Sequence, residues 1–302
     1  HYAYRSTVEN NIYEEATAAD AFAKGMEHFR KGEVMHAIQA FEVASRAMGE
    51  ANEDESWRML GVCHAENDDD KKAIICLRRC LEIDPYNLDA LLALGTSHVN
   101  EMDSVRALDC LRSWITHNPD FHGLELQDDE YSDGTLMDEV MQLMLAAAAH
   151  AQEGPQSADV LTVLGVLYNV THDFDNAVHC FEQVLLKRPG DYSTLNKIGA
   201  TLANSSRSSD AIPLYRQALE TRPRYTRGWL NLGISHANIG EHADAARAYI
   251  MAIRLNPEAM HIYGYLRVLL AMMDRLDAVQ LLGDKDVDGV ERLLFGTVTL
   301  PK

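Results

Sequence analysis

Basic residues are scarce in this sequence. Its 302 residues include 27 Lys and Arg against 46 Asp and Glu, which gives a formal net charge of −19. Such a surface repels phosphate backbones and anionic lipids, so we expect no nucleic-acid partner and favour a basic ligand. Solubility is an alternative explanation of the same charge, which therefore does not identify the ligand.

Long apolar runs are also missing. The most apolar stretches, LMLAAAAHA at 143–151 and YLRVLLAMM at 265–273, are far shorter than the roughly 18 residues of a membrane span. No signal peptide is recognisable at the start of the sequence. We therefore expect a cytoplasmic protein.

Cysteines are few and lack the spacing of a metal site or a disulfide framework. Of the five, Cys76 and Cys80 are one helical turn apart, but two further ligands do not follow nearby. The odd count favours a reducing compartment. We predict no bound metal.

Motifs of catalysis are absent as well. The sequence contains no HExxH, GxSxG, phosphate-binding loop or dinucleotide fingerprint. We therefore predict neither an enzyme nor a protein with a cofactor or a small-molecule substrate.

One nine-residue pattern recurs five times. Each copy is followed at fixed distances by alanine, by leucine or an aromatic residue, and by proline, and the prolines at 85, 119, 189, 223 and 257 are 34, 70, 34 and 34 residues apart. This is the tetratricopeptide pattern, whose unit is a pair of antiparallel helices, A and B. The copies are WRMLGVCHA (57–65), LLALGTSHV (91–99), LTVLGVLYN (161–169), LNKIGATLA (195–203) and WLNLGISHA (229–237).

The recurring residue types suit close packing of two helices. Glycine at repeat position 8 lets helix A approach helix B, while alanine at position 20 and the larger residue at position 24 fill the remaining space. Proline at position 32 ends helix B before the next unit. The histidines at position 11 and the cysteines of helix B occupy packing positions, so we predict that they are buried rather than reactive.

Clear repeats run over 54–87, 88–121, 158–191, 192–225 and 226–259, and a first repeat fits 18–51. We therefore predict an all-α tetratricopeptide-repeat superhelical solenoid in four parts. Residues 1–121 hold an N-terminal segment and repeats 1–3, 122–157 a degenerate fourth repeat that acts as a hinge, 158–259 repeats 5–7, and 260–302 a C-terminal helical cap.

Asparagines cluster at the positions of helix A that face the groove of such a solenoid. Asparagine is a poor helix former, and four or five of them cost about 2 kcal/mol together. A carboxamide both donates and accepts hydrogen bonds, so a ladder of them suits an extended peptide backbone. An alternative for the asparagines at position 13 is that they end helix A. The groove set is Asn100, Asn196, Asn204, Asn231 and Asn238.

Other groove positions predict a ligand with a free carboxylate and an apolar end. Arg227 and Lys197 suit a carboxylate, and the small residues Thr96, Val99, Ala200 and Ala203 leave a shallow apolar pocket. The acidic stretch ENDDD at 66–70 suits a basic side chain of the ligand, although a solvated turn is the simpler reading of it.

Four segments resemble one family beyond the general repeat consensus. They are CLRRCLEIDP (76–85), ALLALGTSHVNE (90–101), NKIGATLANS (196–205) and NLGISHANIGEHADA (231–245), and they are similar to the receptor for the type-1 peroxisomal targeting signal. The resemblance implies a cytoplasmic cargo receptor that binds the C-terminal Ser-Lys-Leu-like tripeptide of matrix proteins. It also implies import into peroxisomes or glycosomes, with cycling to their membrane.

The resemblance also implies roles for single residues. In the family, the residues matching the five groove asparagines bind the peptide main chain and carboxylate, and those matching Arg227 and Lys197 are basic groove residues. Thr96, Val99 and Ala200 match the pocket for the terminal leucine, Asn169 matches another groove position, and Glu66 matches the contact with the basic residue of the signal. Docking to peroxisomal membrane proteins is expected of an N-terminal region that this sequence does not contain.

Two other readings of the repeats remain open. A clamp for the acidic tail of a chaperone needs several lysines and arginines in the groove, whereas the second repeat is acidic. An assembly scaffold without a pocket for a linear motif would bind no short peptide.

Overall fold

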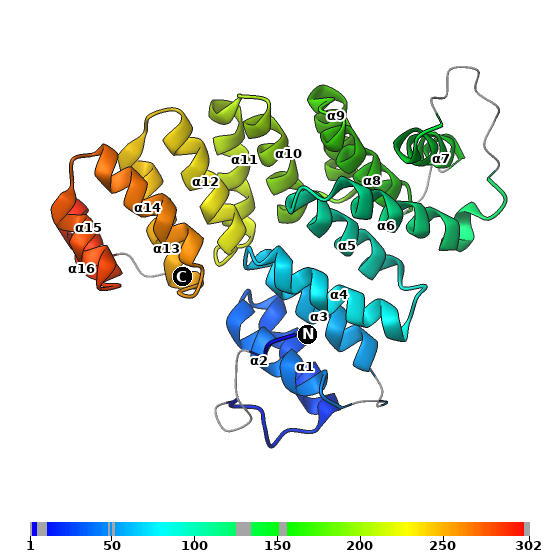
Figure 1. Cartoon of the computed structure of the whole chain (residues 1–302), viewed down its shortest axis with the longest axis horizontal. Coiled ribbons are helices and arrows are strands. Elements are labelled where there is room, and N and C mark those ends of the chain that lie inside the picture. Colours follow the sequence, from blue (N-terminus) through cyan, green and yellow to red (C-terminus); the bar gives the residue numbers. More distant parts are fainter. Residues whose placement is uncertain are drawn as a thin grey trace. The chain divides into compact units, whose positions relative to one another are not determined.

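The structure is a computed structural model that describes residues 2–4, 11–47, 49, 52–124, 134–150 and 156–298. Throughout these ranges the regular elements are α-helices and a short 3-10 turn, without a strand, which confirms the all-α class (Figure 1). In the same ranges, no helix has the length and apolar character needed to cross a membrane.

The helices belong to two compact units. The first unit comprises His1–Ala65 and Asp69–Pro189, and the second comprises Glu66–Asp68 and Gly190–Lys302. This division follows Pro189, whereas the sequence places a joint at 122–157, so the predicted domain boundaries and hinge stay predictions.

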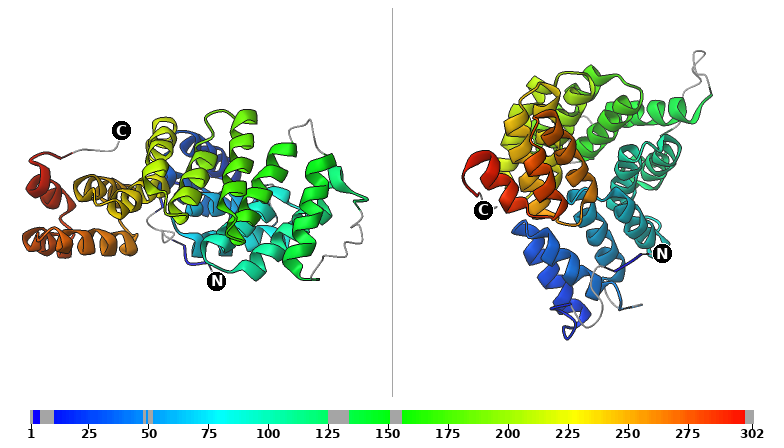
Figure 2. Two further views of the ribbon diagram at one scale, coloured as in Figure 1. Left: turned by 90° about the horizontal axis from the view of Figure 1, so that it is seen from above. Right: turned by 60° about the vertical axis from the view of Figure 1, so that its left-hand side comes forward.

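Most of the predicted repeats appear as pairs of antiparallel helices. Six pairs, numbered as in Figure 1, are α1 (Ala18–Arg30) with α2 (Val34–Ala44), α3 (Glu53–Glu66) with α4 (Asp70–Ile83), α5 (Leu88–Asn100) with α6 (Ser104–His117), α8 (Gln156–Val170) with α9 (Phe174–Lys187), α10 (Tyr192–Asn204) with α11 (Ser208–Thr221), and α12 (Thr226–Asn238) with α13 (His242–Leu255). In the second unit, α11 packs on both α10 and α12, so the hairpins α10–α11 and α12–α13 lie side by side (Figure 2).

The turn between helices A and B has the same backbone in every one of these pairs. The residue at repeat position 15 has a positive φ, between 58° and 80°, which reverses the chain in one tight turn. An aspartate at the next position then caps helix B in several repeats, as when Asp103 accepts a hydrogen bond from the Arg106 amide. The residues with positive φ are Gly32, Asp68, Met102, His172, Ser206 and Gly240.

Helix A touches helix B at the glycine of position 8. A Cβ atom added to Gly199 would lie 2.6 Å from the ring of Tyr215, which is 1% exposed. The same contact recurs in the other pairs, and the alanines at position 20 are buried beside it. The predicted packing roles of positions 8, 20 and 24 are therefore confirmed. The other contacts are Gly25 with Phe41, Gly61 with Leu77, Gly95 with Leu111, Gly165 with Phe181 and Gly233 with Tyr249.

The stretch predicted as a degenerate repeat is described only in part. Residues 125–133 and 151–155 lie outside the described ranges. The short turn η2 (Pro119–Phe121) precedes this stretch, whose described part holds the helix α7 (Leu136–His150), which packs on both α6 and α8. Inside the first unit α5 also contacts α8.

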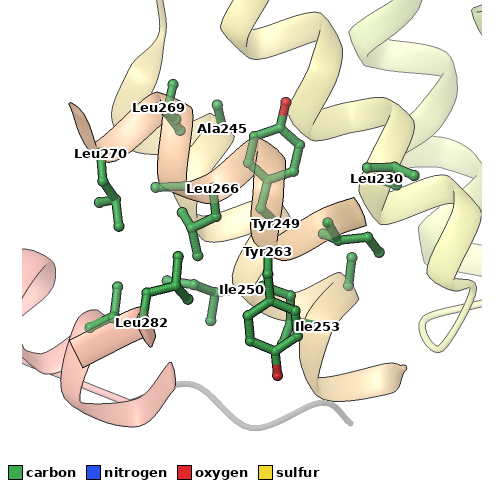
Figure 3. Packing of buried hydrophobic residues seen from close by; sticks show 14 of the residues in the cluster. Leu230, Ala245, Tyr249, Ile250, Ile253, Tyr263, Leu266, Leu269, Leu270 and Leu282 are labelled. Carbon is green, nitrogen blue, oxygen red and sulfur yellow. The ribbon is translucent and has the colours of Figure 1, made fainter. Parts of the chain in front are cut away.

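The second unit ends in the helices predicted as a cap. These are α14 (Met260–Met272), α15 (Leu276–Gly283) and α16 (Val287–Phe295). Tyr249 and Ile253 of α13 meet Leu266 and Leu270 of α14 and Leu282 of α15 in one apolar cluster (Figure 3). The cap thus buries the apolar side of the last repeat.

The position-11 histidines and the cysteines behave as the repeat pattern predicts. His64, His98 and His236 are 1%, 4% and 2% exposed, and every cysteine is buried except the half-buried Cys110. Burial raises the pKa of Cys110 and of Cys180 to about 11, and that of Cys80 to about 12. These thiols therefore stay protonated and unreactive near neutral pH.

We expect Gly199→Ala to destabilise the protein, because the new methyl group meets the Tyr215 ring. An overpacking cost of about 1–3 kcal/mol exceeds the gain of about 1 kcal/mol in helix propensity. Gly264→Ala in α14 is the matched control, since no atom lies within 4 Å of the added methyl group, and it should stabilise by about 0.5–1 kcal/mol. Urea denaturation followed by circular dichroism measures both changes, and a stabilised Gly199→Ala protein would contradict the contact.

We expect stability to fall below about pH 6.5 partly through His98. Burial lowers the pKa of His98, while the Asp103 carboxylate opposes that shift. The unfolded chain therefore binds a proton more readily than the folded one, and the stability present above the unfolded pKa is lost as the pH falls. Tyrosine is the consensus residue at this position. The melting temperature of His98→Tyr should therefore fall less between pH 7 and 5.5 than that of the wild-type protein. The exposed His179→Tyr serves as control, and identical pH slopes for all three proteins would contradict this role of His98.

Candidate peptide-binding site

Two of the predicted carboxamides meet in the second unit. The amide nitrogen of Asn231 on α12 donates to the carbonyl oxygen of Asn196 on α10 at 3.0 Å. Asn196 is 5% exposed and Asn231 is half-buried. The bond uses one of the two donor hydrogens of Asn231 and one acceptor position of Asn196, so the pair retains capacity for further hydrogen bonds.

Two cationic side chains accompany this pair. Lys197 follows Asn196 on α10, and its ammonium group donates to the Ser193 hydroxyl at 2.8 Å. Burial lowers the pKa of Lys197, the Asp191 carboxylate raises it, and the Arg227 guanidinium lowers it further. The Arg227 guanidinium therefore lies near enough to act on Lys197, and two neighbouring cations suit a carboxylate.

The asparagines at position 13 end their helices and are exposed. Asn238 donates to the hydroxyl of Ser208 at 3.1 Å, and Asn100 donates to the Asp70 carboxylate at 3.2 Å. Ser208 and Asp70 each begin helix B of the preceding repeat, so these asparagines join neighbouring repeats. Asn204 differs from these two. The residue that begins helix B of the preceding repeat is Phe174 there, and its side chain neither donates nor accepts hydrogen bonds.

The predicted apolar pocket is divided between the units. Ala200 lies on α10, one helical turn after Asn196, whereas Thr96 and Val99 lie on α5 of the first unit. The Thr96 hydroxyl donates to the Leu92 carbonyl of its own helix at 3.0 Å. Asn169 is half-buried on α8. A pocket shared by these residues stays a prediction.

Glu66 is buried in an ion pair within the second unit. Its carboxylate accepts from the Arg222 guanidinium at 2.8 Å and from the Tyr192 hydroxyl. Burial raises the pKa of Glu66, while the guanidinium and the hydroxyl act in the opposite direction. Its predicted contact with a basic ligand residue stays a prediction, and such a residue would compete with Arg222 for the same carboxylate.

The neighbouring acidic residues also have protein partners. Asp68 lies 3.4 Å from Arg227 and 2.8 Å from His261, and the backbone carbonyl of Asn67 accepts from Asn256 at 2.9 Å. The turn Glu66–Asp68 is therefore anchored in the second unit. Sequence reasoning missed Arg222 and Asn256, because they occupy position 31, next to the repeat proline, where the pattern carries no requirement for a side chain.

Within the described residues, two groups of side chains have the arrangement of metal ligands. They are His28, Glu33 and His36, and His236, Glu241 and Asp244. The sequence analysis predicted no metal and did not single out either group.

Comparison with known proteins shows what the chain is similar to. Tetratricopeptide-repeat family models match residues 54–87 and 196–260. The peroxisomal targeting signal 1 receptor of Dictyostelium discoideum is 37% identical over 281 residues, which are 91% of this chain and 43% of that protein. The peroxisomal targeting signal receptor of Yarrowia lipolytica is 34% identical over 295 residues, 91% of this chain and 48% of that protein. Over 91% of its length the chain is thus similar to peroxisomal targeting signal receptors.

The match is confined to part of each relative. The chain spans less than half the length of both receptors, and the PEX5-related protein of Homo sapiens is 34% identical over 63% of this chain and 32% of its own length. Among solved structures, MamA from Desulfovibrio magneticus has a TM-score of 0.44 at 18% identity, covering 68% of this chain and 95% of that one. This likeness is too weak to add to the assignment.

We expect Glu66→Gln to destabilise the protein by about 3 kcal/mol, because it removes the carboxylate charge that pairs with the buried Arg222 guanidinium. The exposed pair Arg207–Asp210, at 2.9 Å, offers a matched control. Asp210→Asn should change stability by less than about 0.5 kcal/mol. Chemical denaturation measures both, and equal effects would show that the Glu66 ion pair contributes no more than a surface pair.

Proposed function

We propose that this chain is the cargo-binding part of an import receptor and that it binds the C-terminal Ser-Lys-Leu-like signal of matrix proteins bound for peroxisomes or glycosomes. The observation that carries the proposal is the Asn196–Asn231 hydrogen bond between two A helices, with Lys197 and Arg227 beside it. The names of the relatives, which are peroxisomal targeting signal receptors, support the same function.

Each part of a C-terminal peptide has a candidate partner. The remaining donors and acceptors of Asn196 and Asn231 suit a peptide main chain, and Asn204 extends that surface along α10. Lys197 and Arg227 suit the terminal carboxylate, where each charge-assisted hydrogen bond contributes roughly 1.5–3 kcal/mol. Ala200 suits the apolar terminal side chain, and the family resemblance implies the same role for Thr96 and Val99.

Several of the predicted site residues already have protein partners. Arg227 lies 3.4 Å from Asp68, so an incoming carboxylate competes with an internal one. Asn238 and Asn100 already join neighbouring repeats, and the ligand adds to or replaces those bonds. The net affinity is the difference between the two sets of contacts.

The proposed activity is binding and not catalysis. We further propose that the protein works in the cytoplasm and cycles to the peroxisomal or glycosomal membrane. Docking to peroxisomal membrane proteins stays a prediction from the family resemblance.

We expect a fluorescent peptide ending in Ser-Lys-Leu to bind and its C-terminal amide to bind at least about tenfold more weakly, because the amide lacks the carboxylate charge. Asn196→Ala should weaken binding of the acid peptide by about five- to thirtyfold. Fluorescence anisotropy titrations measure all of these affinities.

Asn176→Ala is the matched control, since Asn176 is an exposed asparagine on the B helix α9. It should leave the affinity unchanged. Equal affinity for the acid and the amide would reject the carboxylate site, and the absence of any peptide binding would favour an assembly scaffold. Binding of an acidic chaperone tail in place of Ser-Lys-Leu would favour a chaperone clamp.

A further inference from the structure

The first repeat brings two imidazoles and a carboxylate together at one corner. His28 lies near the end of α1, Glu33 immediately precedes α2, and His36 lies in the first turn of α2. One ligand atom from each residue lies within 4.8 Å of the other two. The Nδ1 atom of His28 is 2.5 Å from the Glu33 carboxylate, and the rings of His28 and His36 are 5.3 Å apart.

Two imidazoles and a carboxylate are a ligand set for Zn²⁺ and related transition metals, in which solvent can complete a tetrahedral site. Ligands bound to one Zn²⁺ at about 2.0–2.1 Å are roughly 3.3 Å apart. Small side-chain rotations therefore bring the three groups to that separation. The exposed His36 has room for such a rotation, whereas His28 and Glu33 are half-buried and already adjacent.

A second contact orients the central ligand. The hydroxyl of Tyr13 lies 2.6 Å from Nε2 of His28. With the ring proton on Nε2 donated to Tyr13, the Nδ1 lone pair is directed toward Glu33 and a shared metal. Ligating histidines in proteins usually have such a partner on their other ring nitrogen, because it fixes the tautomer and the ring orientation.

Comparison with the other repeats shows which part of this arrangement is particular to the first repeat. A histidine at position 11 next to an acid at position 16 also occurs as His236 with Glu241 at 2.5 Å and as His98 with Asp103 at 3.8 Å. That pair is thus a feature of the hairpin. The second imidazole belongs to the first repeat alone, because position 19 holds Lys72, Arg106, Asn176, Asp210 and Asp244 in the other aligned repeats.

We propose that His28, Glu33 and His36 form a binding site for one divalent transition-metal ion of the zinc type. Without metal, Nδ1 of His28 carries the ring proton and shares it with Glu33. On coordination the imidazole takes the tautomer protonated at Nε2, which donates to the Tyr13 hydroxyl oxygen, and Nδ1 binds the ion. The ion links the end of α1 to the start of α2 and so fastens the first hairpin. This site is independent of peptide binding and goes beyond the proposed receptor function.

Isothermal titration of the chain without a polyhistidine tag tests the site, with ZnCl₂ as the probe. We expect one Zn²⁺ bound with micromolar affinity and a rise in melting temperature, because a ligand of the folded state stabilises it. His36→Ala should weaken this binding by at least about tenfold and remove the thermal shift. It leaves the His28–Glu33 hydrogen bond in place, and circular dichroism without metal checks the fold.

His236→Gln is the matched variant for the second group, which has one imidazole and two carboxylates. It should leave the zinc affinity and the thermal shift unchanged. Unchanged zinc binding in His36→Ala overturns the proposal, as does loss of binding in His236→Gln alone or the absence of zinc binding by the wild-type chain. A misfolded His36→Ala protein is replaced by His36→Gln, for which the same losses are expected.

Discussion

The contact between a glycine on helix A and a large residue on helix B is the constraint on which the other features of this fold depend. At Gly199 the missing side chain lets the Tyr215 ring lie against the backbone of α10, and the same contact recurs in five other hairpins. Because each hairpin closes in the same way, successive A helices present equivalent positions to their neighbours. Position 5 of one repeat and position 6 of the next can then meet, as Asn196 and Asn231 do.

The charges of the second unit are arranged around its own acidic turn. Glu66 forms an ion pair with Arg222, and Asp68 forms one with Arg227. Between them, the backbone carbonyl of Asn67 accepts a hydrogen bond from Asn256. The same unit holds Lys197, whose pKa is lowered by burial. A protein with a formal net charge of −19 thus holds Lys197, Arg222 and Arg227 in one unit and balances part of their charge internally. A ligand carboxylate would compete with Glu66 and Asp68 for these cations. A ligand that makes other contacts besides its carboxylate is therefore favoured.

Sequence reasoning succeeded where the determinant is local and repeated. The glycine of position 8, the alanine of position 20 and the buried histidines of position 11 follow from a fixed spacing, and the structure confirms them. It was less informative about pairs distant in sequence. Glu66 and Arg222 are separated by 156 residues, and no periodicity identifies one as the partner of the other. His36 was missed for a related reason, since its significance depends on the turn that brings α2 back against His28. The peptide-site residues remain predictions. Thr96 and Val99 lie in the first unit and Ala200 lies in the second, so no contact within one unit tests a pocket made of all three.

The hydrogen bonds from Asn100 to Asp70 and from Asn238 to Ser208 give these carboxamides a second duty. Each one forms a hydrogen bond to the adjacent hairpin and is also a polar group at the end of an A helix. A molecule that recruits such an amide alters the tie that sets the angle between two hairpins. The packing of neighbouring hairpins thus depends in part on the same amides that the sequence predicts for the ligand.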